Sequence, residues 1–414
     1  MREGVCVYSP YPTGGMPLYV AELLGAITGA AGSVDGEGGP SVEWLSSTDL
    51  DRRFLDGRYV VHPVLPAIRD ASQFRTRIGY VVSRVLHHVR RDRRFLAWVR
   101  SRADIGAVHV QETPTLLPHL VVRLLRRRGT GVLVTVHNVR RHDYPPFLRP
   151  ATVDRWLRRT YLDSDCLFVH SRGLADELER FLTAGGACTV PPIRVVPHGI
   201  WSTTAVPERI GEQRPAGRRL LFFGTIRRNK GLHLLLEAAA RGDLAGYRIT
   251  VAGEVAEPDH LDQIIVPLVE KARAAGVVID LRPEFVPDDE VAALCAAHDV
   301  LVLPYTEDFV AQSGAAFMGL AHGLPIVATR SGALGELMTE HRIGVLAAAA
   351  TPSAIAAAVH ELCTLPEDGV AALADGMRRA AETLTWGGMA ATTVAEYRRV
   401  LSRGRTPVAR GGLR

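Results

Sequence analysis

The sequence predicts an α/β protein made of two parallel-sheet domains. Short apolar runs alternate with helical patterns along all 414 residues, and this alternation is typical of parallel α/β sheets. The series starts at residue 5 and starts again at residue 219, after a stretch at 200–217 rich in Thr, Pro and Gly. Such a stretch indicates an interdomain linker.

The apolar runs locate the individual strands. In the first half they predict strands at 5–8, 59–62, 107–111, 132–137, 166–170 and 193–196. In the second half they predict strands at 219–223, 248–252, 278–281, 300–304, 325–328 and 344–346. We expect domains at 1–204 and 205–385, then a helix at 386–402 and a loose tail at 403–414.

Composition limits the class of protein. The formal net charge is +5 and 47% of the residues are hydrophobic, values typical of soluble globular proteins, so we expect no nucleic-acid partner. Five widely spaced cysteines without a CxxC pair argue against a disulfide framework or a zinc site. With no leader-like pattern before the first strand, a cytoplasmic location is expected. The alanine-rich run at 343–360 predicts a helix with Thr351 as N-cap and Pro352 as its first residue, not a membrane span.

Two loops of the second half carry features of an anion site. Arg227 and Lys230 lie three residues apart between the strand at 219–223 and a helix, where cations can stabilise charge on a diphosphate leaving group. Lys230 is one of only two lysines among 49 basic residues, so its position favours a role that needs a compact charge. Ser313-Gly314 opens a helix and can offer backbone N–H groups to an anion. A solvated basic loop and an ordinary helix start are the alternative interpretations.

The first half has two comparable loops. Gly14-Gly15 follows the first strand, and paired glycines allow a backbone to approach a ligand closely. His137 ends the strand at 132–137 and Asn138 follows it, at the edge of a parallel sheet where ligands bind.

The segment from Gly224 to Gly231 resembles the Gly-x-x-Arg-x-x-Lys-Gly phosphate loop of the GT-B glycosyltransferases of family 4 (glycosyltransferase group 1). The glycine loop, the histidine strand, the Ser313-Gly314 loop and a Gly-x-Pro turn at 323–325 follow in the family's order. The resemblance implies two Rossmann-like, doubly wound domains facing across a cleft. The first would bind the acceptor and the second a nucleotide-sugar, and the helix after Trp386 would cross back to the first domain.

The resemblance also implies roles for individual residues. Arg227, Lys230 and His137 would form the catalytic group, with the two cations on the diphosphate and His137 beside the sugar. Asn138 and Asp143 would lie on the acceptor side. The donor would contact Gly14, Gly15, Thr225, Glu254, Phe285, Val286, Ser313, Gly314 and Met318.

The chain departs from the family's pattern in one loop. Many relatives carry two glutamates eight positions apart, the second of which contacts the ribose. The corresponding residues here are Val310 and Met318. The chain therefore resembles a Ser-Gly variant of the loop, without either carboxylate.

The resemblance implies a retaining transfer of a hexose from a UDP- or GDP-sugar to a hydroxyl acceptor. In the family's usual mechanism the departing phosphate deprotonates the acceptor, so no metal and no cofactor are expected. The acceptor could be a glycan, a lipid-linked saccharide or a secondary metabolite. Two alternatives stay open: a degenerate, non-catalytic partner or sugar-binding subunit, and a GT-B nucleotide-sugar epimerase or hydrolase.

Three other features have competing interpretations. The helix at 80–102 combines an apolar stripe with seven arginines, so it could lie at the inner membrane face, face an anionic acceptor, or simply pack on the core. Asp163-Ser164-Asp165 spells a metal-binding Asp-x-Asp but lies in an expected solvated turn. Asp165, His170 and Ser171 suggest a hydrolase triad but lack its Gly-x-Ser-x-Gly elbow.

Overall fold

The chain forms two compact α/β units, each around a parallel sheet. The computed structural model describes residues 2–31, 39–67, 77–111, 117–140, 148–201, 218–309 and 312–403. One unit comprises Met1–Pro197 with Trp386–Arg414, and the other His198–Thr385. Both sheets have the doubly wound order of Rossmann-like domains, which confirms the predicted fold class.

The sheet of the first unit has seven parallel strands in the order β3-β2-β1-β4-β5-β6-β7. The order reverses between β1 and β4, which defines the switch point where ligands of such sheets bind. The strands are β1 (Gly4–Tyr8), β2 (Val42–Ser47), β3 (Val60–Leu65), β4 (Ile105–Val110), β5 (Gly131–Thr135), β6 (Cys166–Val169) and β7 (Ile193–Val195).

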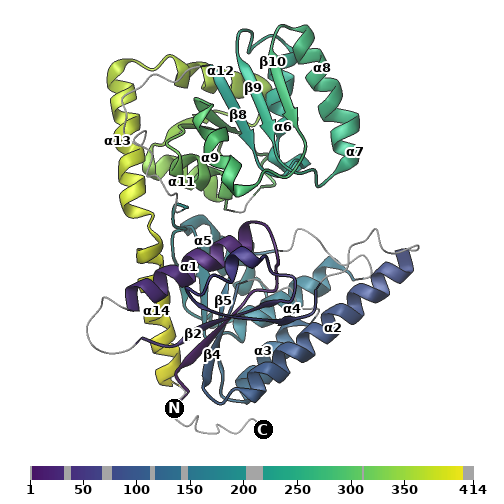
Figure 1. Ribbon diagram of the computed structural model, residues 1–414, viewed down its shortest axis with the longest axis vertical. Coiled ribbons are helices and arrows are strands. Elements are labelled where there is room, and N and C mark those ends of the chain that lie inside the picture. Colours follow the sequence, from purple (N-terminus) through teal and green to yellow (C-terminus); the bar gives the residue numbers. More distant parts are fainter. Residues whose placement is uncertain are drawn as a thin grey trace. The chain divides into compact units, whose positions relative to one another are not determined.

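Helices cover both faces of this sheet (Figure 1). One face packs on apolar side chains of α2 (Arg77–Ser101), α3 (Pro118–Arg127), α4 (Pro150–Leu162) and α5 (Arg172–Thr183). The other face packs on α14 (Trp386–Arg403), which itself packs on α1 (Gly15–Ala31). Two polar contacts fix α14: the Tyr397 hydroxyl lies 2.7 Å from His109 Nδ1, and Arg194 Nε donates to Glu396 Oε1 at 2.6 Å.

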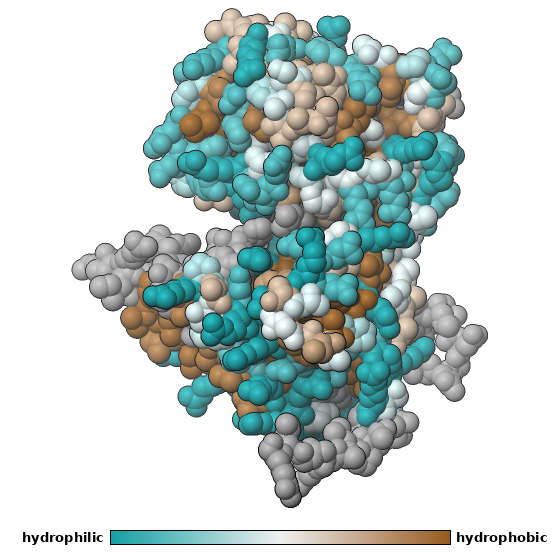
Figure 2. Space-filling view, turned by 180° about the vertical axis from the view of Figure 1, so that it is seen from behind, coloured by the Kyte–Doolittle hydropathy of each residue, from teal (hydrophilic) through white to brown (hydrophobic). Residues whose placement is uncertain are grey.

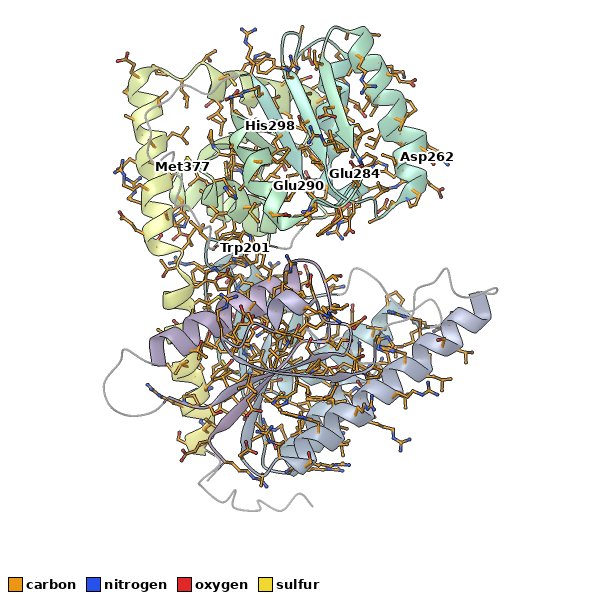
Figure 3. The ribbon with its side chains drawn as sticks, viewed as in Figure 1. Trp201, Asp262, Glu284, Glu290, His298 and Met377 are labelled. Atoms are coloured by element: carbon orange, nitrogen blue, oxygen red, sulfur yellow. The ribbon has the colours of Figure 1, made fainter. Side chains whose placement is uncertain are left out.

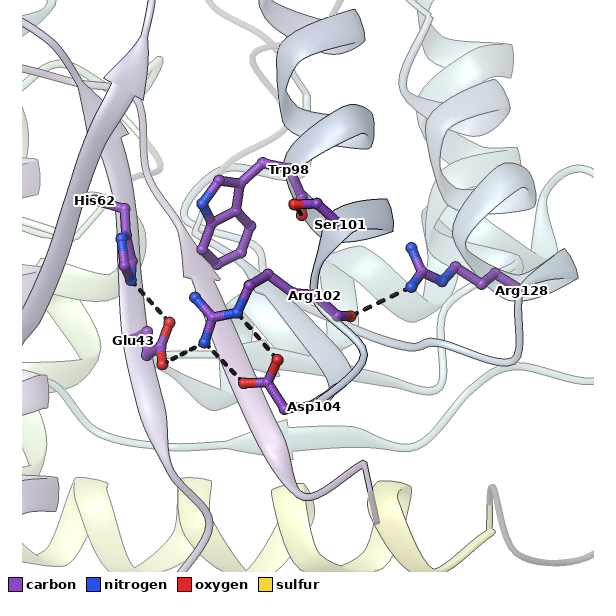
Figure 4. A network of polar contacts seen from close by, with 7 residues as sticks. All are labelled: Glu43, His62, Trp98, Ser101, Arg102, Asp104 and Arg128. Atoms are coloured by element: carbon purple, nitrogen blue, oxygen red, sulfur yellow. Dashed lines mark hydrogen bonds and ion pairs between the residues drawn. The ribbon is translucent and has the colours of Figure 1, made fainter.

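Strand β2 is missing from the sequence prediction because its pattern is polar. Glu43 is buried in it, where a carboxylate needs partners. Arg102 Nη2 donates to Glu43 Oε1 and His62 Nε2 lies beside Glu43 Oε2, both at 2.8 Å. Arg102 also binds Asp104 and lies over the ring of Trp98 (Figure 4). These contacts compensate the buried carboxylate of Glu43, so β2 can pair between β1 and β3.

The sheet of the second unit has six parallel strands in the order β10-β9-β8-β11-β12-β13, with its switch point between β8 and β11. All six were predicted. The strands are β8 (Arg219–Phe223), β9 (Arg248–Ala252), β10 (Val278–Arg282), β11 (Val300–Leu303), β12 (Ile326–Thr329) and β13 (Gly344–Ala347).

Eight α-helices and a π-helical turn surround this sheet in the described part of the unit. Apolar side chains of α6, α8 and α12 fill one face, and α10 and α11 contact the strands as well. The elements are α6 (Leu232–Ala240), α7 (Pro258–His260), the π-helix η4 (Leu261–Ile265), α8 (Val266–Ala274), α9 (Asp288–Ala296), α10 (Gly314–Ala321), α11 (Gly332–His341), α12 (Pro352–Cys363) and α13 (Glu367–Thr383).

The start of the second unit is anchored by aromatic contacts. The His198 ring stacks on Phe317 at 4.4 Å between centroids, and Trp201 Nε1 donates to the Gly314 carbonyl at 3.1 Å. These contacts explain why the division falls before His198 and not at residue 205.

The alanine-rich run forms a capped helix as predicted. Helix α12 begins at Pro352, and the N-cap Thr351 accepts a hydrogen bond from Ala354 N. Among the described residues, no helix has both the length and the apolarity that crossing a bilayer requires.

Candidate functional site

The loop after β8 lies at the switch point of the second sheet. Its backbone is held by the neighbouring loop after β9: Gly224 N donates to Ala252 O at 3.0 Å, and Ile226 N donates to Glu254 O at 2.8 Å. Thr225 lies half-buried between these two contacts, and the Glu254 side chain is exposed. The loop therefore has a fixed course from the sheet to the short 3-10 helix η3 (Arg228–Lys230).

Gly231 joins η3 to α6 where no other residue fits. Its φ is +64°, in the left-handed region, and a Cβ there would lie 1.8 Å from the carbonyl oxygen of Pro304. Next to it, Thr306 N donates to Asn229 O at 3.1 Å. The loops after β8 and β11 are thus in direct backbone contact, and this contact places the predicted cations beside the second loop.

Lys230 points its ammonium at two buried aromatic rings. Its Nζ lies 3.9 Å from the ring centroid of Tyr305 and 4.0 Å from that of Phe309, a cation–π arrangement. Burial lowers the pKa of Lys230 well below its usual value, and the charge of Arg227 lowers it further. Within the described ranges no carboxylate pairs with Lys230.

Arg227 adds a second cation, and no carboxylate of the described residues pairs with it. It precedes η3 in an extended conformation, and its buried Nε has no hydrogen-bond partner among the residues that the structure describes. By contrast, the neighbouring Arg228 is exposed and pairs with Glu257 at 3.4 Å. Two nearby cations, for which the described residues supply no counter-ion, are chemically suited to an anion with more than one negative charge.

The start of α10 is tied to the same aromatic group. The Tyr305 hydroxyl lies 2.8 Å from Ser313 Oγ, and Ser313 Oγ accepts from Ala316 N at 3.3 Å as the N-cap of α10. The Ser313 hydroxyl is therefore buried and occupied in fixing the helix start. Gly314 is exposed, and the first amides of a helix have no partner within it, so its backbone N–H is the group offered to an anion.

Three further predicted donor residues, Met318, Phe285 and Val286, belong to the second unit. Met318 is half-buried on α10, one turn after Gly314. Phe285 and Val286 lie between β10 and α9, directly after Glu284 (Figure 3). Phe285 is 55% exposed, so its ring is not part of the core.

In the first unit, His137 lies in an aromatic group at the carboxyl end of β5. Its ring is 5.1 Å from Tyr19 and 5.0 Å from His170. His137 and Asn138 are partly exposed, so both can reach a ligand. Gly14 has a φ of +84° and is exposed with Gly15 at the start of α1. Asp143 and Val310 lie outside the described residues.

Two motifs that were set aside have structural roles. Asp165 accepts from Val132 N and from Arg126 Nη1, both at 2.8 Å, and so fixes the turn before β6. Ser171 is the N-cap of α5, accepting from Leu174 N. His170 donates from Nδ1 to Val196 O at 2.9 Å. In the described ranges, no group of three or more His, Cys, Asp or Glu residues could hold a metal ion.

Sequence reasoning missed the aromatic partners of Lys230. Tyr305 and Phe309 lie about 75 residues after Lys230 in the chain, and nothing in the local pattern connects them. The only available signal was their place directly after a buried strand, where ligand-binding loops begin.

The fold and this site define a class of protein, the GT-B glycosyltransferases. A sucrose-phosphate synthase from Thermosynechococcus elongatus matches 97% of this chain and all of its own, with a TM-score of 0.71 at 16% identity. Anabaena HepE, solved in complex with UDP, matches 97% of this chain with a TM-score of 0.64 at 14% identity. At such identities the likeness shows the fold.

Sequence comparison identifies the family. The model for group 1 glycosyl transferases matches residues 217–364. An MMP alpha-(1->4)-mannosyltransferase of Mycolicibacterium hassiacum is 34% identical over 305 residues, which are 67% of this chain and 68% of that protein. The chain belongs to the group 1 glycosyltransferases. Two other relatives match over shorter stretches: the chain spans 38% of a D-inositol 3-phosphate glycosyltransferase of Pseudarthrobacter chlorophenolicus and 66% of a Mycobacterium tuberculosis glycogen synthase.

Proposed function

We propose that this protein is a retaining glycosyltransferase that moves a hexose from a UDP- or GDP-sugar to a hydroxyl acceptor. The observation that carries the proposal is the pair of cations at the switch point of the second sheet, Arg227 and Lys230, which no carboxylate of the described residues pairs with. The fold neighbour with bound UDP supports a nucleotide donor.

A diphosphate fits this loop better than a single carboxylate does. Lys230 is desolvated and depends on ring faces for stabilisation, so an arriving anion gains a strong interaction with it. Arg227 offers a planar fork to a second phosphoryl oxygen. The exposed N–H of Gly314 adds a neutral donor at the start of α10.

The nucleoside would extend from the diphosphate toward the other loops. Phe285 and Val286 are proposed to contact the base, and Glu254 the sugar. Met318 occupies the position where relatives have a ribose-binding glutamate, so we propose that ribose is held by packing and not by a carboxylate.

The proposed chemistry uses the leaving group as the base. The bond from the anomeric carbon to the phosphate oxygen breaks, and a bond from the same carbon to the acceptor oxygen forms on the same face. The acceptor's proton moves to the departing phosphate oxygen, giving a nucleoside diphosphate and a glycoside. Arg227 and Lys230 stabilise the charge on the diphosphate as it leaves. The scheme invokes no metal and no cofactor.

Residues of the first unit are assigned to the sugar and the acceptor. His137 and Asn138 are proposed to orient these groups, and the exposed backbone at Gly14 and Gly15 to allow their close approach. The five free cysteines support a reducing, cytoplasmic compartment for the reaction.

The test is a transfer assay with product analysis. The protein is incubated with UDP-glucose or GDP-mannose and an acceptor panel of inositol phosphate, maltose and a mannoside, and the product anomer is read by NMR. We expect an α-linked product from an α-linked donor and, without acceptor, almost no donor consumption. Donor consumption without acceptor would instead indicate an epimerase or hydrolase. Intact donor throughout, with no nucleotide binding, would indicate the degenerate partner.

A variant links the activity to the site. We expect Lys230→Ala to abolish turnover while circular dichroism shows an intact fold. Lys271→Ala removes the only other lysine, which lies exposed on α8, and should leave the rate unchanged. Near-normal kinetics in Lys230→Ala would contradict the role of the cation.

A further inference from the structure

Helix α2 exposes an apolar stripe that the core of the first unit does not cover. Its inner face buries Arg91, Phe95 and Val99. On the outer face Val82 is 52% exposed, Leu86 49% and Val89 42%. Their spacing of four and three residues puts them on one side of the helix. The sequence pattern did not separate these three from the buried residues of the same helix.

The neighbouring helix α3 continues this apolar surface. It packs beside α2, and its Leu120 is 43% exposed and its Leu124 39%. Figure 2 shows hydrophobic side chains gathered on the flank of this unit where α2 runs, at the left of that view. We call the exposed face of α2 and α3 the helical face. It carries five of the eleven large hydrophobic side chains that are exposed among the described residues.

The charges on the helical face are of one sign. The only acidic residue of the two helices is Asp92, which is partly buried. Two arginines of α3, Arg123 and Arg126, lie near aspartates beside β6. Five further arginines are exposed and have no carboxylate partner in the part of the chain that the structure describes: Arg90, Arg93, Arg94, Arg100 and Arg127.

We propose that the helical face docks this protein on the surface of a bilayer rich in anionic lipids. Aliphatic side chains flanked by arginines, with the partly buried Asp92 as the one acidic residue of the two helices, match an interface that is apolar inside and negatively charged outside. An exposed apolar surface on a water-soluble unit usually marks an interaction site. A nucleic acid would use the arginines but leave the aliphatic stripe in water. The inference does not depend on the proposed transferase activity.

The experiment is cosedimentation with vesicles at 0.1 M NaCl. One set contains phosphatidylcholine alone, and the other contains phosphatidylcholine with about one third phosphatidylglycerol. We expect binding to the anionic set only, and release at 0.5 M NaCl because salt screens the arginines. Equal binding to both sets, or binding to neither, would overturn the proposal.

Two double variants separate the contributions of the aliphatic and the arginine side chains to vesicle binding. Leu86→Gln with Val89→Gln should weaken binding at least tenfold. Arg90→Gln with Arg93→Gln should weaken it about 25-fold, at about fivefold per basic residue. Control variants replace an exposed valine of β3 and an exposed arginine of β9, Val60→Gln and Arg248→Gln, and should bind as the parent does. Unchanged binding in both double variants would refute the assignment.

A further measurement tests whether a second copy of this protein, and not a bilayer, binds the helical face. Sedimentation velocity without lipid should show the same monomer for the parent and for Leu86→Gln with Val89→Gln. A parent dimer that this variant dissociates would overturn the membrane proposal. Thermal unfolding of each variant confirms that loss of binding is not loss of fold.

Discussion

Acidification should destabilise the first unit through two buried histidines. His109 lies between Tyr397 and Thr135, with ring nitrogens 2.7 and 2.8 Å from their hydroxyl oxygens. Burial lowers its pKa to about 3, with a smaller contribution from His170. Burial likewise lowers the pKa of His170 to about 4, against the opposing effect of its hydrogen bond to Val196 O.

The direction and the size of this change in the free energy of unfolding follow from proton linkage. An unfolded histidine titrates near pH 6.5, so between pH 6.5 and 4 the unfolded chain binds protons that the folded unit excludes. Stability is full above this window and is lost as the pH falls through it. From pH 7 to 5 each histidine costs about 2 kcal/mol, or about 4 kcal/mol together. That loss is a large part of the 5–15 kcal/mol typical of a domain.

The assay is urea unfolding at pH 7 and pH 5, followed by tryptophan fluorescence. Four of the five tryptophans belong to the first unit and report mainly on it: Trp44, Trp98, Trp156 and Trp386. We expect His109→Gln to remove about 2 kcal/mol of the pH-dependent loss. His322→Gln changes a half-buried histidine of the second unit and should not change the pH dependence of the first unit's unfolding transition. If His109→Gln kept the full loss, the assignment of a buried neutral imidazole would be wrong.

Two further outcomes concern the phosphate loop. Gly231→Ala should destabilise the second unit by at least about 2 kcal/mol in urea, because its Cβ meets Pro304 O. Gly242→Ala, with a φ of +84° but open space, should cost only about 1 kcal/mol; equal costs would contradict the steric argument. Calorimetric donor affinity should fall up to tenfold per pH unit above the lowered pKa of Lys230, whereas Lys230→Arg should show no such fall.

The strands could be predicted from sequence where their buried residues form a continuous apolar run. Strands covered on both faces are continuous apolar runs, so all six strands of the second sheet could be located from sequence. Strand β2 could not, because Glu43, Ser46 and Ser47 break its apolar pattern. The buried charge is tolerated only through Arg102 and His62, and pairing over such sequence distances has no local signal.

The candidate site was predictable in its charges but not in its surroundings. The spacing of Arg227 and Lys230 indicated an anion loop, and their roles on a donor stay predictions. The rings of Tyr305 and Phe309 became visible as partners only in three dimensions. Ser313 was predicted to contact the donor, and the sequence did not show that its hydroxyl is occupied by Tyr305 and the helix cap.

Calorimetry with UDP-glucose and GDP-mannose tests the central claim, that Arg227 and Lys230 hold the donor diphosphate, most directly. The account predicts binding of one donor by the parent and a loss of about 30- to 900-fold in Arg227→Gln with Lys230→Met, from two charge-assisted contacts of about 1–2 kcal/mol each. Arg228→Gln with Lys271→Met removes equal charge from exposed positions and should bind as the parent does. Equal donor affinity in the two double variants would contradict the account.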